Sequence, residues 1–212
     1  MTIQHSPRPG VAAWDFDETI TTHDTLVPFL AHVGGKAALA KSLATHSPLL
    51  VRGLRSSDRR DEAKERVLAD ILRGRHVDEV THAGLQYART LPALFRRESL
   101  ERIGWHRDQG HRLVIVSASL VYYLRPIATE LGFDEVIGVD MEVGPDDRLT
   151  GALVGRNVRK AEKAVRLTSW IETQGLVDPE IWAYGDSSGD EELLAMSHYP
   201  RWHGKRSHLN DA

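Results

Sequence analysis

The stretch that decides the fold is VAAWDFDET, residues 11–19. Residues 11–16, apolar except for Asp15, have the length and composition of a short buried strand. Two carboxylates, Asp15 and Asp17, stand where this strand should end. Because ligands of open α/β sheets bind outside the carboxyl ends of the strands, the segment predicts a central strand that runs into a polar site.

A helical block follows this strand. From residue 24 to about residue 109, apolar residues recur at helical spacing, most clearly over residues 61–72 and 94–109. Each of these two segments is followed closely by a glycine that can end a helix. A block of this size directly after the first strand indicates a helical insert.

After Gly110 the pattern alternates between strands and helices. Strands are predicted at 113–116, 136–139 and 181–184, helices at 121–131, 157–174 and 191–196, and a hairpin at 141–154. Strands that alternate with helices favour a parallel sheet. We therefore expect an α/β fold with a Rossmann-like parallel core (11–23 and 110–212) and an α-helical cap (24–109) inserted after the first strand.

The composition restricts the class of protein. The 212 residues are 41% apolar and 27% charged, as in ordinary globular chains, and the net charge of −3 is not that of a nucleic-acid-binding protein. The chain has no cysteine, which excludes thiol nucleophiles and disulfides. Residues 1–10 lack the apolar segment of a secretory signal, and no apolar run could span a bilayer. We expect a cytoplasmic protein that binds neither nucleic acid nor membrane.

Polar side chains follow three of the predicted strands. Asp15 and Asp17 follow the first, Ser117 follows the second, and Asp186 and Asp190 follow the last. Carboxylates from two strands could hold Mg²⁺, which prefers oxygen ligands. A carboxylate could attack phosphorus, and a hydroxyl with a nearby lysine could neutralise the phosphoryl oxygens. The pattern predicts phosphoryl transfer.

These residues resemble the motifs of the haloacid dehalogenase (HAD) superfamily of phosphatases. Within it, the chain is similar to the phosphoserine-phosphatase-like branch, subfamily IB, which carries a helical (C1) cap after the first motif. DFDET at 15–19 is similar to the first motif, DxDx[TV]; Ser117 to the second; and GDSSGD at 185–190 to the fourth, GDxxxD. The resemblance extends over residues 11–196 and implies a HAD-like, Rossmannoid core.

The third motif of this branch is a lysine on the helix before the fourth motif. Lys163 lies 186 − 163 = 23 residues before Asp186 and is followed by Leu167 in the K-x-x-x-L spacing of the branch. Lys160 is a rival for this position, although close relatives often have a glycine there.

The resemblance implies a role for each residue. Asp15 would be the nucleophile that forms an aspartyl-phosphate, and Asp17 the general acid and base. Ser117, Ala118 and Lys163 would bind the phosphoryl group. The Mg²⁺ ligands would be Asp15, Asp17 through its backbone carbonyl, Asp186 and Asp190. The implied activity is the Mg²⁺-dependent hydrolysis of a small phosphorylated metabolite, a phosphoric monoester.

Four residues bear on the substrate. Ala118 and Ser119 stand where phosphoserine phosphatases usually have two glycines, and Ser187 replaces a glycine of their fourth motif. Asp24 resembles the acidic residue with which those enzymes contact the substrate amine, which favours phosphoserine or another amine-bearing phosphate, and Asp24 would then bind substrate. The alternative is that Asp24 caps a helix that starts at Thr25.

Two other functions stay open: a phosphomutase or phosphotransferase of the same fold, and a non-catalytic module that binds a phosphorylated ligand. GDSSG at 185–189 also fits the GxSxG elbow of serine hydrolases. That fold needs further strands to carry its acid and its histidine, and only 212 − 187 = 25 residues follow Ser187. The sequence does not predict an oligomeric state.

Overall fold

The computed structural model describes residues 9–53 and 57–211. The prediction that the chain has no secretory signal rests on residues 1–10, and residues 1–8 lie outside the described ranges. The elements are β1 (Gly10–Trp14), α1 (Leu26–Gly34), α2 (Lys36–Gly53), α3 (Ser57–Leu72), α4 (Val77–Ala88), η1 (Leu91–Leu94), α5 (Arg97–Asp108), β2 (Arg112–Leu120), α6 (Val121–Leu131), β3 (Glu135–Val139), β4 (Met141–Val143), β5 (Leu149–Leu153), α7 (Ala161–Thr173), β6 (Glu180–Gly185), α8 (Glu191–Ala195), β7 (Tyr199–Trp202) and η2 (Gly204–Asp211). No helix within the described ranges is long and apolar enough to cross a membrane.

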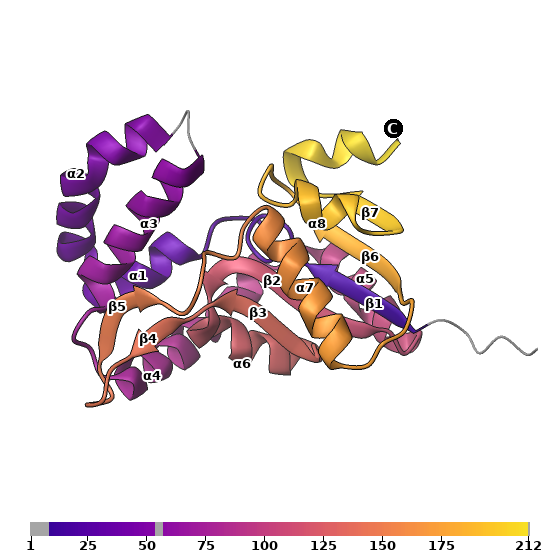
Figure 1. The fold of residues 1–212 in the computed structure, drawn as a ribbon, viewed down its shortest axis with the longest axis horizontal. Coiled ribbons are helices and arrows are strands. Elements are labelled where there is room, and N and C mark those ends of the chain that lie inside the picture. Colours follow the sequence, from indigo (N-terminus) through magenta and orange to yellow (C-terminus); the bar gives the residue numbers. More distant parts are fainter. Residues whose placement is uncertain (1–8, 54–56, 212) are drawn as a thin grey trace, which may run out of the picture.

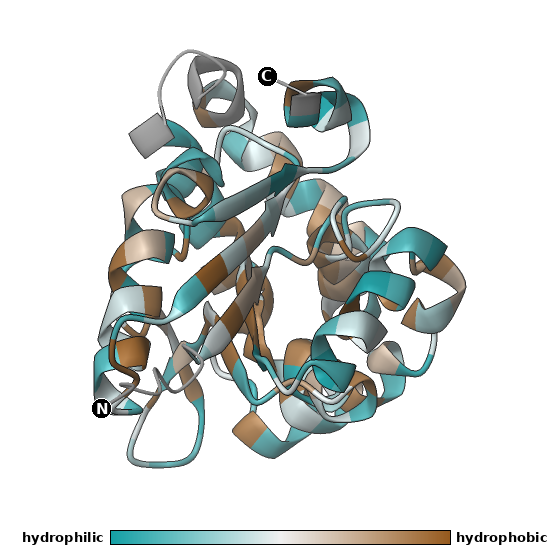
Figure 2. Ribbon diagram, turned by 90° about the vertical axis from the view of Figure 1, so that its right-hand side faces the viewer, coloured by the Kyte–Doolittle hydropathy of each residue, from teal (hydrophilic) through white to brown (hydrophobic). Residues whose placement is uncertain are grey.

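The core is a parallel sheet with the strand order β3-β2-β1-β6-β7. Strand β1 lies at its centre and every one of its residues is buried, because the strand is apolar on both faces. Figure 2 shows brown segments on strands at the middle of the molecule and teal turns on the helices around them. The predicted α/β class, a parallel core with a helical insert after the first strand, is confirmed.

The inserted helices lie between β1 and β2 in sequence, and α1–α3 form a group at one end of the molecule (Figure 1). Helix α4 packs on α6, and a Cβ at Gly84 would lie 2.3 Å from the carbonyl oxygen of Tyr122, so glycine permits this close approach. Helix α5 instead packs on β2 and buries Ile103 and His106. These contacts favour assigning α5 to the part of the chain that contains the sheet. The predicted end of the helical cap at residue 109 stays a prediction.

The two segments that connect the insert to the rest of the chain, residues 20–22 and 94–96, lie side by side. Two backbone hydrogen bonds of 2.8 Å join residues 20–22 to residues 94–96, around an antiparallel bridge between Thr21 and Phe95. The insert therefore leaves and returns through one junction, immediately after the segment that carries Asp17.

Several predicted elements have different ends in the structure, and two of these differences concern candidate site residues. Strand β2 continues to Leu120, four residues beyond its predicted end, so Ser117 lies within the strand instead of after it. Helix α7 begins at Ala161 instead of 157, because Lys160 has φ +54° and ψ −132°, which is not helical.

Strand β7 is absent from the prediction. Its four residues are mostly exposed and include Pro200, so they lack the apolar run that marks a strand. The strand pairs only with β6 at the edge of the sheet, where a proline is tolerated because one side of the strand needs no partner.

Candidate active site

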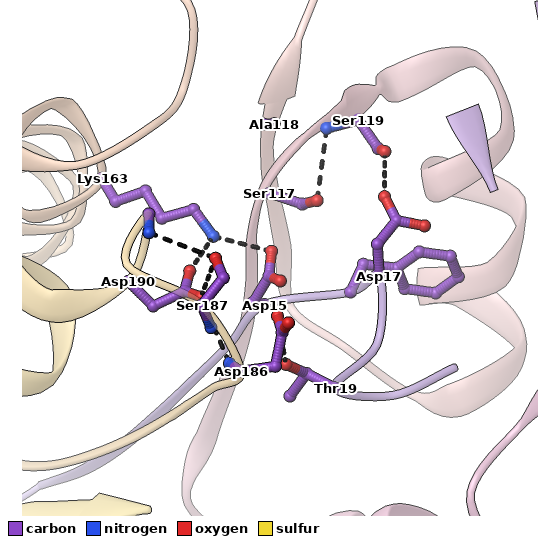
Figure 3. Close-up of polar contacts among 12 residues, drawn as sticks. Asp15, Asp17, Thr19, Ser117, Ala118, Ser119, Lys163, Asp186, Ser187 and Asp190 are labelled. Atoms are coloured by element: carbon purple, nitrogen blue, oxygen red, sulfur yellow. Dashed lines mark hydrogen bonds and ion pairs between the residues drawn. The ribbon is translucent and has the colours of Figure 1, made fainter. Parts of the chain in front are cut away.

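The predicted site residues come together at the carboxyl edge of the sheet (Figure 3). Asp15 directly follows β1, Ser117 lies near the end of β2, and Asp186 directly follows β6. Lys163 reaches in from the first turn of α7, and Asp190 precedes α8. All five line one cavity of about 320 Å³. The other residues that line it are Asp17, Glu18, Asp24, Arg60, Ala118, Arg159, Ser187 and Gly189.

Lys163 is buried between two carboxylates. Its Nζ donates to Asp15 Oδ1 at 2.6 Å and to Asp190 Oδ1 at 2.5 Å, and the residue is only 2% exposed. Burial alone would lower the pKa of this lysine, but the two negative charges outweigh it and hold the pKa above its usual value. The same contact outweighs the burial of Asp190 and keeps the pKa of that carboxyl low. Lys163 is therefore charged at neutral pH.

Lys160, the rival lysine, does not reach this cluster. Its backbone amide donates to the carbonyl of Gly189, but its side chain makes no hydrogen bond or ion pair with the residues that the structure describes. Of the two lysines, only Lys163 contacts the carboxylates at the strand ends.

Three carboxylates form a group that could hold a metal ion. One oxygen from each of Asp15, Asp186 and Asp190 lies within 4.8 Å of the others. Burial, followed by repulsion from Asp15 and Asp190, raises the pKa of Asp186 to about 8. Burial raises the pKa of Asp15 to about 6 although Lys163 opposes the shift. A hard divalent cation would relieve this repulsion, so the donor set fits Mg²⁺.

The carboxylate of Asp17 points away from this group toward α1 and β2 (Figure 3). Its Oδ1 accepts hydrogen bonds from the backbone amide of Thr25 at 2.7 Å and from the Thr25 hydroxyl at 2.5 Å, and its Oδ2 accepts one from the Ser119 hydroxyl. Burial, and then the negative charge of Asp24, raise the pKa of Asp17 to about 7, against the opposing effect of these hydrogen bonds. Asp17 can therefore exchange a proton near neutral pH.

Ser117 and Ala118 form the wall of the cavity between the two aspartates. Ser117 is 1% exposed, and its hydroxyl oxygen accepts a hydrogen bond from the amide of Ser119 at 3.2 Å. The side chain of Ser119, one of the departures from the glycine pair, is the one that contacts Asp17.

A lysine of the insert, Lys64 on α3, also reaches this wall, and the sequence gives no sign of it. Its Nζ donates to the carbonyl oxygen of Ala118 and, at 3.0 Å, to Asn157 Oδ1, while the Asn157 amide donates to Asp61 Oδ1 at 2.8 Å. Burial lowers the pKa of Lys64 to about 8. In the sequence, Lys64 is one charge among many on a charged helix face, which is typical of a solvated surface.

Asp24 combines both predicted placements. Its Oδ1 accepts a hydrogen bond from the amide of Val27 at 3.1 Å, so its side chain helps to cap α1, although the N-cap position is Thr25 and the helix begins at Leu26, one residue later than predicted. It also lines the cavity of about 320 Å³ described above, which we call the catalytic-site cavity. Capping therefore does not remove the carboxylate from the site.

The serine-hydrolase alternative has no support in the geometry. The hydroxyl of Ser187 donates to Asp190 Oδ2 at 3.1 Å, where a serine nucleophile would need a histidine.

Comparison with known proteins gives matches over most of the chain. The family model of haloacid dehalogenase-like hydrolases matches residues 12–195. Protein CicA of Caulobacter vibrioides is 30% identical over 201 residues, which is 93% of this chain and 87% of that protein. Histidinol-phosphatase of Neisseria meningitidis is 28% identical over 98 residues, which is 45% of this chain and 44% of that protein.

Solved structures share the fold. A protein of unknown function from Bordetella pertussis superposes with a TM-score of 0.77 at 25% identity, over 92% of this chain and 89% of that one. A substrate-bound phosphoserine phosphatase superposes with a TM-score of 0.65 at 15% identity, over 97% and 91% of the two chains. With the family match over most of its length and the motif residues gathered at the strand ends, the chain belongs to the haloacid dehalogenase-like hydrolase family, and its fold is similar to that of phosphoserine phosphatases.

Proposed function

We propose that this hydrolase is a Mg²⁺-dependent phosphatase that removes the phosphoryl group of a small phosphorylated metabolite by way of an aspartyl-phosphate on Asp15. The observation that carries the proposal is the contact of Lys163 with both Asp15 and Asp190 in a cavity that also contains Asp17 and Ser117. A nucleophile, a proton donor and a cation thus face one space that is large enough for a small ligand.

In the first step, a carboxylate oxygen of Asp15 attacks phosphorus, and the bond from phosphorus to the ester oxygen breaks. Asp17 gives its proton to that oxygen, which leaves as an alcohol. In the second step, water attacks the phosphorus of the aspartyl-phosphate, and Asp17 takes a proton from the water. The bond from phosphorus to the Asp15 oxygen breaks, which frees the carboxylate and releases inorganic phosphate. A pKa of about 7 suits Asp17 to both tasks.

The remaining polar groups stabilise the charge of the phosphoryl oxygens. Lys163 supplies a buried positive charge whose electrostatic effect is larger than it would be in water, and Ser117 supplies a hydroxyl donor. Asp15, Asp186, Asp190 and the backbone carbonyl of Asp17 would hold Mg²⁺. When bound, the ion supplies further positive charge to the phosphoryl oxygens.

The substrate that the site favours carries a positive charge beside its phosphate. A carboxylate such as Asp24 on the cavity wall is electrostatically unfavourable for a phosphate dianion unless the substrate also has an ammonium or imidazolium group. Two relatives bear the names histidinol-phosphatase and phosphoserine phosphatase, and both names refer to amine-bearing phosphates. Such metabolites belong to the cytoplasm, where we propose that the protein acts.

The deciding experiment is a screen of purified protein against phosphorylated metabolites, with Mg²⁺ and with EDTA. We expect inorganic phosphate to be released with Mg²⁺ and not with EDTA. Ca²⁺ should inhibit, because it takes more ligands at longer distances than Mg²⁺. Asp186→Ala should lower the activity as metal removal does.

Each part of the proposal can fail separately. Full activity in EDTA would refute the metal requirement. Transfer of the phosphoryl group to a second metabolite without release of phosphate would identify a mutase or phosphotransferase. Binding of a metabolite with neither outcome would identify a non-catalytic module.

A further inference from the structure

A second cavity, of about 490 Å³, lies on the same edge of the sheet, beyond the ends of β6 and β7. In Figure 1 this corner is the yellow end of the chain, where β7 and η2 lie beside the end of β6. Its walls carry three arginines, one glutamate and two aromatic residues: Arg96, Arg102, Arg201, Glu98, Tyr184 and Trp202. We call it the arginine pocket.

The arginine pocket has a positive charge that the protein does not neutralise. Its only carboxylate among the described residues, Glu98, lies 4.0 Å from Arg96 and is 67% exposed at its side chain, so this ion pair is weak. The guanidinium of Arg201 has no ion-pair partner among residues 9–53 and 57–211. Burial lowers the pKa of His203, which also lines the pocket, so this residue adds no charge at neutral pH. Three guanidinium groups against one carboxylate leave a charge of +2.

Two of the arginines are fixed in place before any ligand arrives. Arg102 donates from Nε to the Tyr184 hydroxyl at 2.8 Å, and its guanidinium carbon lies 3.9 Å from the centre of the Trp105 ring. Arg96 donates from Nε to the carbonyl oxygens of Glu18 at 3.2 Å and Thr21 at 3.1 Å. Because these hydrogen bonds use Nε, the terminal nitrogens remain to contact a ligand, and little side-chain freedom would be lost on binding.

The arginine pocket is separate from the catalytic-site cavity. The two cavities share no lining residue, and the loop that begins at Glu18 lies between them. Glu18 lines the catalytic-site cavity, whereas its carbonyl oxygen is held by Arg96 of the arginine pocket. The pocket also lies at the first turn of α5, whose amides add to the positive potential.

We propose that the arginine pocket binds a small ligand with at least two negative charges on phosphate or carboxylate groups, independently of the phosphoryl site. Planar guanidinium groups match both kinds of oxyanion with paired hydrogen bonds. Because the two cavities share no lining residue, the ligand need not be the substrate.

The test is isothermal titration of the metal-free protein with two probes, inorganic pyrophosphate and citrate. Arg201→Glu reverses one charge of the pocket and should weaken binding at least about tenfold, as expected for loss of a charged contact. Arg97→Glu is the matched control, because Arg97 is next to Arg96, is 91% exposed at its side chain and does not line the pocket. It should bind the probes nearly as the wild type does.

A second variant shows whether weaker binding comes from the changed charge of the pocket or from misfolding of the Arg201→Glu protein. Ser207→Glu brings a negative charge to another wall of the pocket, at an exposed residue, and should weaken binding in the same way. A preference for pyrophosphate would identify a phosphorylated ligand, and a preference for citrate a polycarboxylate. The proposal is overturned if neither probe binds at millimolar concentration, or if both pocket variants bind as Arg97→Glu does.

Discussion

Asp15 and Asp17 are separated by one residue, yet they lie in two different surroundings. Asp15 faces the ammonium group of Lys163 and other carboxylates, whereas Asp17 is held by neutral donors, Thr25 and Ser119. Burial raises the pKa of both, to about 6 and about 7. The comparison teaches that two like groups, both buried, can be separated by their partners: Lys163 opposes the rise in the pKa of Asp15, whereas the charge of Asp24 adds to the rise in the pKa of Asp17, as the proposed nucleophile and proton-transfer roles require.

The strongest test of this difference is Asp15→Asn. An amide has nearly the same shape but cannot attack phosphorus, so turnover should fall by several orders of magnitude, as it does when other enzymes lose their nucleophile. The measurement is phosphate release by purified protein, with circular dichroism to confirm the fold. Activity above about one-hundredth of wild type would remove Asp15 from the nucleophile role.

The next test changes the charged partner of Asp15. Lys163→Met should lower kcat about 100-fold or more, because a buried charge near the phosphoryl oxygens is lost. Lys160→Gly is the matched control, and its activity should be close to wild type. It should also raise the free energy of unfolding by about 1 kcal/mol, because φ +54° with ψ −132° favours glycine. The opposite order of kcat would transfer the role to Lys160.

The proton-transfer side of the comparison is tested with Asp17→Asn on two substrates. Loss of the general acid should slow an alkyl phosphate by about 100-fold or more, and an aryl phosphate much less, because an aryl oxide leaves without a proton. Equal losses on both substrates would contradict the assignment.

The pH profile sharpens the same test. With a raised pKa, Asp17 holds its proton below about pH 7, so the single-turnover rate of phosphoryl transfer from an alkyl phosphate should fall as the pH rises through 7. The Ser119 hydroxyl favours the charged form of Asp17, so Ser119→Ala should move this fall to higher pH.

The smallest effect is expected at Asp24. Asp24→Asn keeps a side chain that caps a helix well but removes the negative charge from the cavity wall. The preference of kcat/KM for amine-bearing over neutral phosphates should drop by several-fold, which corresponds to about 1 kcal/mol, while an aryl phosphate is unaffected. An unchanged substrate ranking would leave Asp24 with a capping role alone.

Much of the candidate site could be predicted from sequence because several of its residues directly follow apolar runs that predict strands. The apolar runs of β1 and β6 mark where these strands end, and parallel strands bring their carboxyl ends to one edge, so Asp15 and Asp186 were expected at the same edge of the sheet. The lysine was predicted through the family resemblance instead, because Lys163 and Leu167 match the K-x-x-x-L spacing of its third motif.

The parts that could not be predicted depend on contacts between distant segments. Lys64 reaches Ala118 only because α3 lies over the sheet edge, and no pattern within α3 states where it will lie. The Ser119 contact with Asp17 depends on β2 continuing past residue 116, beyond its continuous apolar run. Strand β7 depends on an edge position that its own exposed residues do not indicate.

The paired crossings at residues 20–22 and 94–96 have a consequence for the construction of chimaeric enzymes. Because backbone hydrogen bonds hold the two ends of the insert together, the insert forms a loop that is closed at its base, beside the sheet. The entropy of closing a loop grows only with the logarithm of its length, so inserts of very different size could be grafted at this junction at small cost in chain entropy. The junction closely follows Asp17, so a grafted insert that keeps a donor to Asp17 in the place of Thr25 would present a new substrate-contacting surface to the catalytic cavity.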